Sequence, residues 1–200
     1  MINPDIFTGR LGNRMFQIAY LYSQVKDGLI PDWYVQNPKY FKKCSDEIKA
    51  LFGAGIRLSP YVAIHIRQAG NPINPDEPKY SENPFYVNLA KTEYYELAVR
   101  WFEGEQFLVF SDDIDFAKKY FLSGKFGNGG AFFFDDTADP VKALNRMAGC
   151  KGHIIANSSF SWWAAYLCPH HNQKVVAPSK DRWYSDGVER TVCPTSWIRL

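Results

Sequence analysis

The chain has 200 residues, of which 46% are apolar and 16% aromatic, and its formal net charge is +2. This length suits one ordinary domain or two small ones, with enough apolar side chains for a packed core. Lys and Arg are scattered along the chain, which argues against a nucleic-acid surface. Residues 1–5 lack signal-peptide features, and no apolar run approaches the roughly 18 residues needed to cross a membrane. We therefore expect a globular, unsecreted, cytoplasmic protein without a transmembrane segment.

The four cysteines show no paired spacing, which favours reduced thiols in a cytosol over disulfides. They are Cys44, Cys150, Cys168 and Cys193. A zinc site made from Cys168, His170, His171 and Cys193 is a second interpretation. It is disfavoured, because this spacing fits no common structural zinc pattern.

Residues 1–60 contain one amphipathic helix, expected over residues 13–25, followed by a stretch with weak periodicity. The segment Gly9-Arg10-Leu11-Gly12-Asn13 precedes that helix. Its glycines, Gly12 among them, can let backbone N–H groups converge on an anion, and the helix dipole adds positive potential. The alternative is a simple turn capped by Asn13.

From Tyr61 onward, short apolar runs rich in β-formers alternate with segments of helical period. We predict strands over residues 61–66, 106–110, 131–134, 153–156 and 174–177. This alternation is typical of an α/β fold, here an open Rossmann-like domain with a parallel sheet and crossover helices. Ligands of such sheets bind at the carboxyl ends of the strands, so the residues that follow each strand are the candidates for chemistry.

Capping residues mark two of the crossover helices. Thr92 is expected to cap a helix that carries Trp101 and Phe102 and stops at Gly104. Asp139 and Pro140 are expected to begin another helix, which runs to about Gly149. The segment 68–91 contains four prolines and is predicted to be a long loop, of the kind that often forms a functional lid.

Polar residues follow three of the predicted strands. Asn157, Ser158, Ser159 and Phe160 open a tryptophan-containing helix, where hydroxyls and free N–H groups can hold a phosphate. The alternative is that serine only caps the helix and the tryptophans lie in the core. His65 lies near the end of the strand 61–66 and Arg67 follows it, so Arg67 is expected to emerge at the same edge of the sheet. A surface ion pair for Arg67 and a core position for His65 are the alternatives.

Ser111, Asp112 and Asp113 follow the strand 106–110, where a carboxylate can accept hydrogen bonds from a ribose or a base. Alternatively, Ser111 or Asp112 caps the next helix. Asp113 and Asp115 also resemble an Asp-x-Asp metal site, but acids in a first helical turn are favoured by the macrodipole alone. We therefore predict no metal site.

Taken together, three segments resemble the α-1,2-fucosyltransferase family. Residues 12–19, Gly-Asn-Arg-Met-Phe-Gln-Ile-Ala, are similar to that family's opening motif, and residues 110–113 and 155–163 match two further motifs almost unaltered. Two features differ from the family pattern. The region between the opening motif and His65 is much shorter, and the family's His-x-Arg-Arg-Gly-Asp is replaced after Arg67 by Gln68, Ala69 and Gly70.

The resemblance implies a GT-B-like arrangement, with a much reduced N-terminal domain over residues 1–60 and a Rossmann-like nucleotide-binding domain over residues 61–200. It implies an inverting, metal-independent transfer of fucose from GDP-fucose to a glycan hydroxyl, α-1,2 to a galactoside. Arg67 and His65 are then the catalytic candidates, and Asp76 or Glu77 in the long loop the candidate bases. The nucleotide-binding candidates are Gly12, Asn13, Ser111, Asp112, Asp113, Asn157, Ser158, Ser159 and Phe160. Two alternatives are another GDP-sugar as donor and a catalytically degenerate nucleotide- or carbohydrate-binding module.

Overall fold

The computed structural model describes residues 11–27, 36–69, 78–127 and 131–200, with the backbone alone for residues 24–27. At the centre of this part of the chain is a sheet of six parallel strands in the order β3-β2-β1-β4-β5-β6. The strands are β1 (Ser59–Ile66), β2 (Gln106–Ser111), β3 (Ala131–Phe134), β4 (Cys150–Ile154), β5 (Lys174–Ala177) and β6 (Ile198–Arg199). The predicted α/β class with a parallel Rossmann-like sheet is confirmed.

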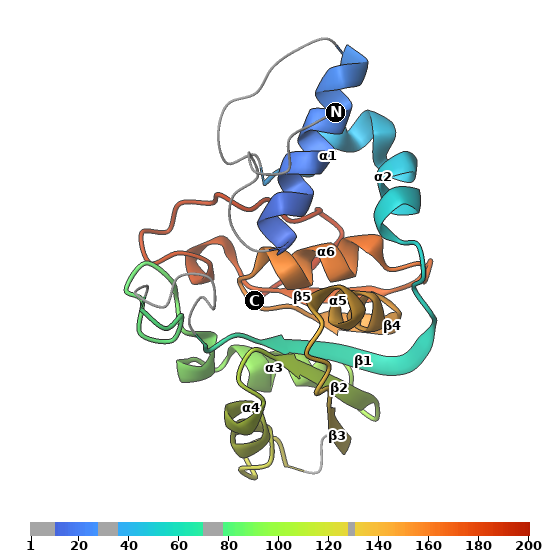
Figure 1. The fold of residues 1–200 in the computed structure, drawn as a ribbon. Coiled ribbons are helices and arrows are strands. Elements are labelled where there is room, and N and C mark those ends of the chain that lie inside the picture. The colour runs from blue at the N-terminus through green and yellow to red at the C-terminus, as the bar shows by residue number, and fades with distance from the viewer. Residues whose placement is uncertain (1–10, 28–35, 70–77, 128–130) are drawn as a thin grey trace.

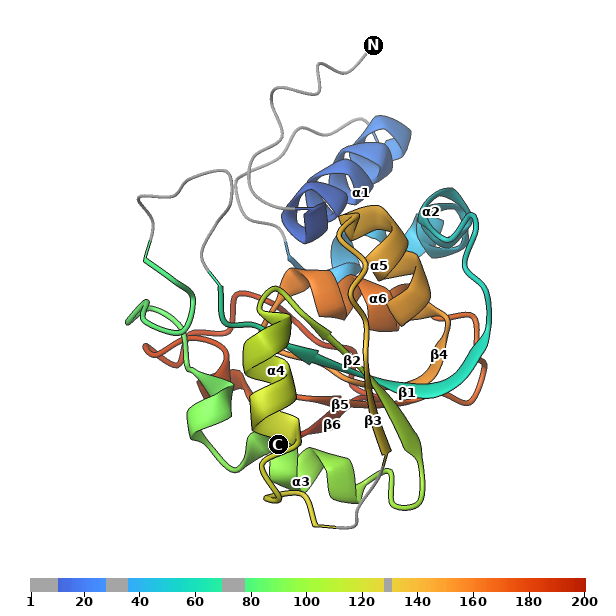
Figure 2. The same ribbon diagram turned by 60° about the horizontal axis from the view of Figure 1, so that its bottom comes forward.

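Helices cover both faces of the sheet, α3 and α4 on one side and α5 and α6 on the other, as Figures 1 and 2 show. The α-helices are α1 (Leu11–Asp27), α2 (Ser45–Phe52), α3 (Tyr94–Arg100), α4 (Ile114–Phe121), α5 (Pro140–Ala148) and α6 (Ser159–Leu167). Short 3-10 helices are η2 (Pro38–Cys44), η3 (Leu89–Lys91) and η4 (Lys180–Arg182).

The two faces of the central strand serve two separate hydrophobic clusters. Val62 and Ile64 of β1 belong to the cluster with α3 and α4, whereas Ala63 between them belongs to the cluster with α5 and α6. Side chains alternate between faces along a strand, and a parallel strand covered on both faces is apolar on both. His65 shares the face of Ala63, and this parity directs its imidazole toward α6.

The direction of the chain across the sheet reverses beside β1. The chain runs from β1 through β2 to β3 on one side, and α5 then returns it to β4 on the other side of β1. The carboxyl ends of β1 and β4 therefore flank a topological switch point, where open α/β sheets bind their ligands. Arg67 follows β1, and Asn157, Ser158 and Ser159 follow β4.

The N-terminal elements form a third layer on α6 (Figure 1). The ring of Phe16 in α1 lies 4.8 Å from that of Trp163 in α6, and Phe41 of η2 stacks on the same indole at 5.5 Å. These aromatic pairs join α1 and η2 to the core that also contains α5 and α6. The division into two domains at residue 60 stays a prediction.

Several element boundaries differ from the expectation. Strand β4 begins at Cys150 and ends at Ile154, earlier than the predicted 153–156. Helix α3 has Glu93 as its N-cap and ends at Arg100, so Trp101 and Phe102 lie in the turn that follows. Asp139 caps α5 as predicted, with its carboxylate accepting from the N–H groups of Val141 and Lys142.

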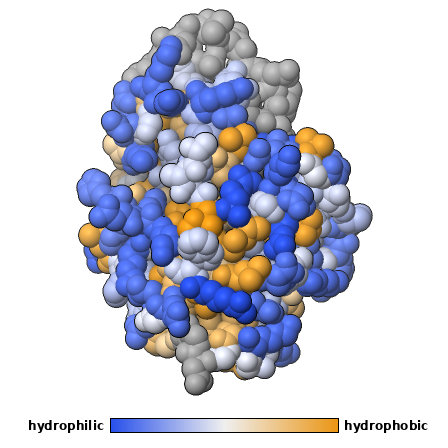
Figure 3. Space-filling view, turned by 180° about the vertical axis from the view of Figure 1, so that it is seen from behind, coloured by the Kyte–Doolittle hydropathy of each residue, from blue (hydrophilic) through white to orange (hydrophobic). Residues whose placement is uncertain are grey.

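Among the described residues, no helix is long and apolar enough to traverse a bilayer. Seen from behind, the surface carries apolar side chains near its middle with polar ones around and between them (Figure 3). Large exposed apolar residues are dispersed over different elements, such as Leu58 before β1 and Leu122 after α4. Single exposed apolar residues are normal for a globular protein.

Candidate functional site

A small polar cavity lies at the switch point of the sheet. Its walls come from the ends of β1 and β4, the start of α1 and the C-terminal segment, and its volume is about 50 Å³. A water needs about 10–15 Å³ by the same measure, so the cavity has room for a group of phosphate size. The described residues that line it are Asn13, Gln36, Arg67, Tyr86, Asn157, Ser158, Ser159, Trp183, Tyr184 and Thr191.

Two serines at the start of α6 have different tasks. Ser158 is the N-cap, and its Oγ accepts from the Phe160 N–H at 3.3 Å and from Arg67 Nη1 at 3.5 Å. Ser159 donates its hydroxyl proton to Asn13 Oδ1 at 2.7 Å. Ser158 is therefore an acceptor in both of these bonds and keeps its own proton for a ligand, whereas the proton of Ser159 is already used.

Gly12 permits a close approach of α1 to α6. A Cβ built on Gly12 would lie 2.5 Å from the carbonyl carbon of Ser159 and 2.6 Å from the nitrogen of Phe160. Side chains do not reach such distances from backbone atoms. Gly12 lies within α1, so close packing and not an unusual backbone angle requires the glycine, and the predicted anion-binding turn is replaced by a helix start.

The starts of α1 and α6 consequently meet at one wall of the cavity, where Asn13, Ser158 and Ser159 line it. Helix N-termini have N–H groups without intrahelical partners and a positive macrodipole end. Arg67 adds a full charge and is the one charged side chain among the described residues that line the cavity. The wall therefore offers a guanidinium and helix-start N–H groups, which are donors suited to an anion.

Arg67 extends along the cavity from the end of β1, with its side chain 20% exposed. Its guanidinium carbon lies 4.3 Å from the centre of the Tyr80 ring, and its Nε lies 4.0 Å from Asp112 Oδ2. Tyr80 is buried, and this burial raises the pKa of its hydroxyl well above the ordinary value. The hydroxyl therefore stays protonated and donates to the carbonyl of Asn157 at 2.8 Å.

The residues Ser111, Asp112 and Asp113 at the end of β2 bind the backbone of their own chain. Asp112 Oδ1 accepts from the N–H groups of Gln68 at 2.7 Å and Ala69 at 3.1 Å. Asp113, and not Ser111 or Asp112, caps α4 by accepting from the Phe116 N–H. Ser111 closes a turn by accepting from the Asp113 N–H at 3.0 Å. None of these three residues lines the cavity, and their predicted nucleotide contacts stay predictions.

The remaining candidates are divided between the cavity wall and the packing behind it. Asn157 lines the cavity, but its Nδ2 donates to the carbonyls of Val87, Arg182 and Trp183. His65 is 5% exposed, and its ring lies 5.5 Å from that of Phe160. His65 is thus buried against Phe160 in the first turn of α6 and does not line the cavity.

Sequence reasoning missed a group of residues, most of them buried, that complete the site. Gln36 donates to Asn13 Oδ1 at 3.1 Å and accepts from the Thr191 hydroxyl, so it ties α1 to the C-terminal segment. Tyr86 and Tyr184 form an isolated antiparallel bridge, and both line the cavity. These contacts join segments far apart in the sequence, and nothing in the local pattern indicates them.

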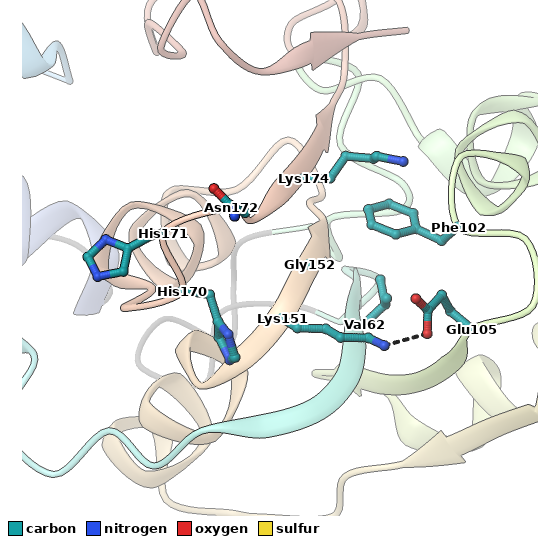
Figure 4. A pocket seen from close by; sticks show the side chains of 9 residues that line it. All are labelled: Val62, Phe102, Glu105, Lys151, Gly152, His170, His171, Asn172 and Lys174. Carbon is teal, nitrogen blue, oxygen red and sulfur yellow. Dashed lines mark ion pairs between the residues drawn. The ribbon is translucent and has the colours of Figure 1, made fainter.

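A larger cavity of about 510 Å³ lies at the amino-terminal ends of the strands (Figure 4). Its cations have partners within the protein: Lys151 pairs with Glu105, and Lys174 donates to the carbonyl of Trp101. His170 Nε2 lies 3.1 Å from the carbonyl of Gly149. Because these groups are engaged and face away from the switch point, the smaller cavity is the better candidate.

The alternative metal sites find no support in the part of the chain that the structure describes. Within it, no three His, Cys, Asp or Glu side chains are grouped so that they could hold a metal ion. The four cysteines are free and buried. Asp76 and Glu77 lie outside the described residues.

The comparisons with known proteins agree on glycosyl transfer. A sequence model of glycosyl transferase family 11 matches residues 42–198. The O-antigen biosynthesis glycosyltransferase WbnK of Escherichia coli is 28% identical over 191 residues, which cover 92% of this chain and 59% of the relative. An alpha-1,2-colitosyltransferase of Escherichia coli is 28% identical over 183 residues, with 82% of this chain and 60% of the relative covered. The chain thus spans about three fifths of the length of these curated relatives, and no solved structure matches it.

Proposed function

Because the chain belongs to glycosyl transferase family 11, we propose that it transfers fucose from GDP-fucose to a hydroxyl of a glycan, α-1,2 to a galactoside. The observation that carries the proposal is the cavity at the switch point. There Arg67, the Ser158 hydroxyl and the starts of two helices surround a space of phosphate size. The diphosphate of a nucleoside diphosphate sugar is the anion that such a donor would place against this wall.

In the proposed reaction, the acceptor hydroxyl oxygen forms a bond to the anomeric carbon from the face opposite the nucleotide. The bond between that carbon and the β-phosphate oxygen breaks through an oxocarbenium-like state, so the configuration inverts. The electron pair leaves with GDP, and the hydroxyl proton passes to a base or to water. Asp76 and Glu77 remain the candidate bases.

Negative charge on the leaving pyrophosphate is greater in the transition state than in the bound donor. A fixed positive group that faces the pyrophosphate oxygens therefore stabilises the transition state more than the ground state. We propose that Arg67 neutralises this charge, with the Ser158 hydroxyl and the N–H groups of α1 and α6 as further donors. No metal is required in this scheme, and EDTA should leave turnover unchanged.

A second candidate is another GDP-linked sugar, and colitose is the obvious choice because one relative is a colitosyltransferase. A third is a module that binds nucleotide without turnover. Gln68, at the position of the family's second arginine, favours this third candidate, because its amide has no charge to offer the leaving group.

The buried free cysteines support our expectation of a reducing, cytoplasmic location.

The decisive experiment is to incubate the protein with GDP-fucose, with and without an array of galactosides, and to measure released GDP. Acceptor-dependent release is expected, together with a larger rise of Tm with GDP than with UDP, because a ligand that binds the native state stabilises it. Binding of GDP without release of GDP from GDP-fucose would favour the module that binds nucleotide without turnover. Faster turnover of GDP-colitose would change the sugar, and equal Tm shifts from GDP and UDP would contradict the guanine assignment.

A further inference from the structure

The guanidinium of Arg67 is held between two side chains that do not line the cavity. The Tyr80 ring lies against its flat face at 4.3 Å, and the Asp112 carboxylate faces its Nε at 4.0 Å. Nη1 is directed at the Ser158 hydroxyl, which does line the cavity. An aromatic face and a carboxylate both attract a guanidinium, so the two contacts favour one orientation of the side chain.

Tyr80 is itself fixed in place. It is 4% exposed, its hydroxyl donates to the carbonyl of Asn157, and its ring stacks on Tyr86 at 4.5 Å. Its backbone N–H donates to the carbonyl of Ala69 at 3.3 Å. The ring under Arg67 therefore cannot turn away without the loss of the hydroxyl's hydrogen bond and of the stacking on Tyr86.

Asp112 fixes the other side of the same structure. One carboxylate oxygen accepts from the backbone N–H groups of Gln68 and Ala69, the two residues directly after Arg67. The other oxygen is the one that faces Arg67. One side chain from the end of β2 thus sets both the path of the backbone after β1 and the electrostatic surroundings of the guanidinium.

We infer that Tyr80 and Asp112 are positioning residues, which hold Arg67 in the orientation that it needs at the leaving pyrophosphate. The inference rests on the proposed function, because it takes Arg67 to be the pyrophosphate ligand. A free arginine side chain loses much rotamer freedom when it is fixed. Because Tyr80 and Asp112 order the Arg67 side chain before the ligand binds, less conformational entropy has to be lost when the transition state forms.

The first test is kinetic and uses conservative pairs. Tyr80→Phe keeps the ring and loses the bond to Asn157, whereas Tyr80→Leu loses the ring. We expect Tyr80→Leu to lower kcat about five- to tenfold, a shift of about 1–1.4 kcal/mol, with KM for GDP-fucose changed less and with a smaller kcat loss for Tyr80→Phe. Asp112→Asn keeps an oxygen for the two N–H groups and loses the charge, so a similar kcat loss is expected. Asp115→Asn, an exposed acid in the first turn of α4, is the matched control.

The second test separates positioning from general damage. In an Arg67→Ala background, neither Tyr80→Leu nor Asp112→Asn should lower kcat further, because the group that they position is gone. Equal losses in both backgrounds would overturn the inference, since the two residues would then act independently of Arg67.

A third measurement does not depend on catalysis. The Nε–Hε group of Arg67 should be ordered in the wild-type protein by ¹⁵N relaxation and mobile in Tyr80→Leu. An Arg67 that is equally ordered in both proteins would overturn the positioning role, whatever the reaction. The positioning role and the proposed function can also fail separately. If Arg67 becomes mobile in Tyr80→Leu, the positioning role is upheld. If the wild-type protein also releases no GDP, and Arg67→Ala leaves its GDP affinity unchanged, the proposed function is rejected.

Discussion

Lysine at position 67 would keep the positive charge of Arg67 but lose the planar fork that can hold two phosphate oxygens. Lysine would also lose the flat contact with the Tyr80 ring. We expect Arg67→Lys and Arg67→Ala to lower kcat by about 10²–10³-fold, the range for removed oxyanion donors, with a smaller loss of GDP-fucose affinity. Gln68→Ala should cost much less, because the Gln68 amide donates to Asn88. Wild-type turnover by a folded Arg67→Ala would make Arg67 a structural residue.

The two serines at the start of α6 should differ in their effect on GDP binding. Ser158 has a hydroxyl proton to offer a phosphate, whereas Ser159 donates its proton to Asn13. A lost hydrogen bond to a charged group costs about 1.5–3 kcal/mol, so Ser158→Ala should weaken GDP binding about tenfold or more. Ser159→Ala should have a smaller effect on GDP and a larger one on the contact between α1 and α6. Calorimetric titration with GDP measures the affinity of each variant. An equal loss of affinity in both variants, or a larger loss in Ser159→Ala, would contradict the role of Ser158 as the phosphate donor.

At the scale of elements, the contact between α1 and α6 depends on Gly12. Alanine is the better helix former by about 1 kcal/mol, so propensity alone predicts that Gly12→Ala is stabilising. The Cβ, however, would lie 2.5 Å from a backbone carbon of α6, and the backbone can relieve this clash only if the two helices separate. We expect a net loss of about 1–3 kcal/mol of unfolding free energy, as for overpacked cores, together with weaker GDP binding. Urea unfolding tests this, and an unchanged or higher midpoint would show that the helices are not so close.

The sequence predicted the architecture well because its signals are local. Alternating apolar runs mark the strands β1, β2, β3 and β5, and the Asp139-Pro140 pair marks the start of α5. The cap of α4 was predicted less well. Three adjacent residues could each supply an acceptor, and β2 continues to Ser111, which leaves Asp113 as the cap. Strand β6 has only two residues and leaves no periodic pattern.

The site was predicted where it follows from strand ends and missed where it depends on distant contacts. The pattern predicted that Arg67 and Ser158 each follow a strand, and the structure brings them together because β1 and β4 are neighbours. Tyr80 belongs to a segment that was predicted to be a loop, and only the fold brings its ring under Arg67. The same holds for Gln36 and Thr191, which are 155 residues apart in the sequence.

At the scale of the whole molecule, stability should depend on pH through a buried histidine on the α5 side of the sheet. His153 is fully buried, and its Nε2 lies 2.9 Å from the carbonyl of Met147, so this nitrogen carries the proton of a neutral ring. Burial lowers the pKa of His153 from 6.5 to about 4, although the hydrogen bond to the Met147 carbonyl and the nearby Gln173 side chain oppose the shift. The unfolded chain therefore binds more protons than the folded one between these values. The contribution is fully present above pH 6.5 and is lost as the pH falls toward 4.

Wild-type protein should lose about 2 kcal/mol of unfolding free energy between pH 7.5 and pH 5 through this one group, out of a limit of about 3 kcal/mol. His153→Gln keeps an N–H donor for the Met147 carbonyl and cannot titrate in this range. We expect the variant to be less stable than wild type at pH 7.5, because its side chain has a different shape, but to lose about 2 kcal/mol less than wild type on going to pH 5. Exposed carboxylates such as Asp186, with a pKa lowered to about 2 by Arg190, titrate below this window and do not mask the effect. Urea midpoints of both proteins at pH 7.5, 6 and 5 measure the difference, and parallel pH profiles would show that His153 is protonated without cost in the folded state.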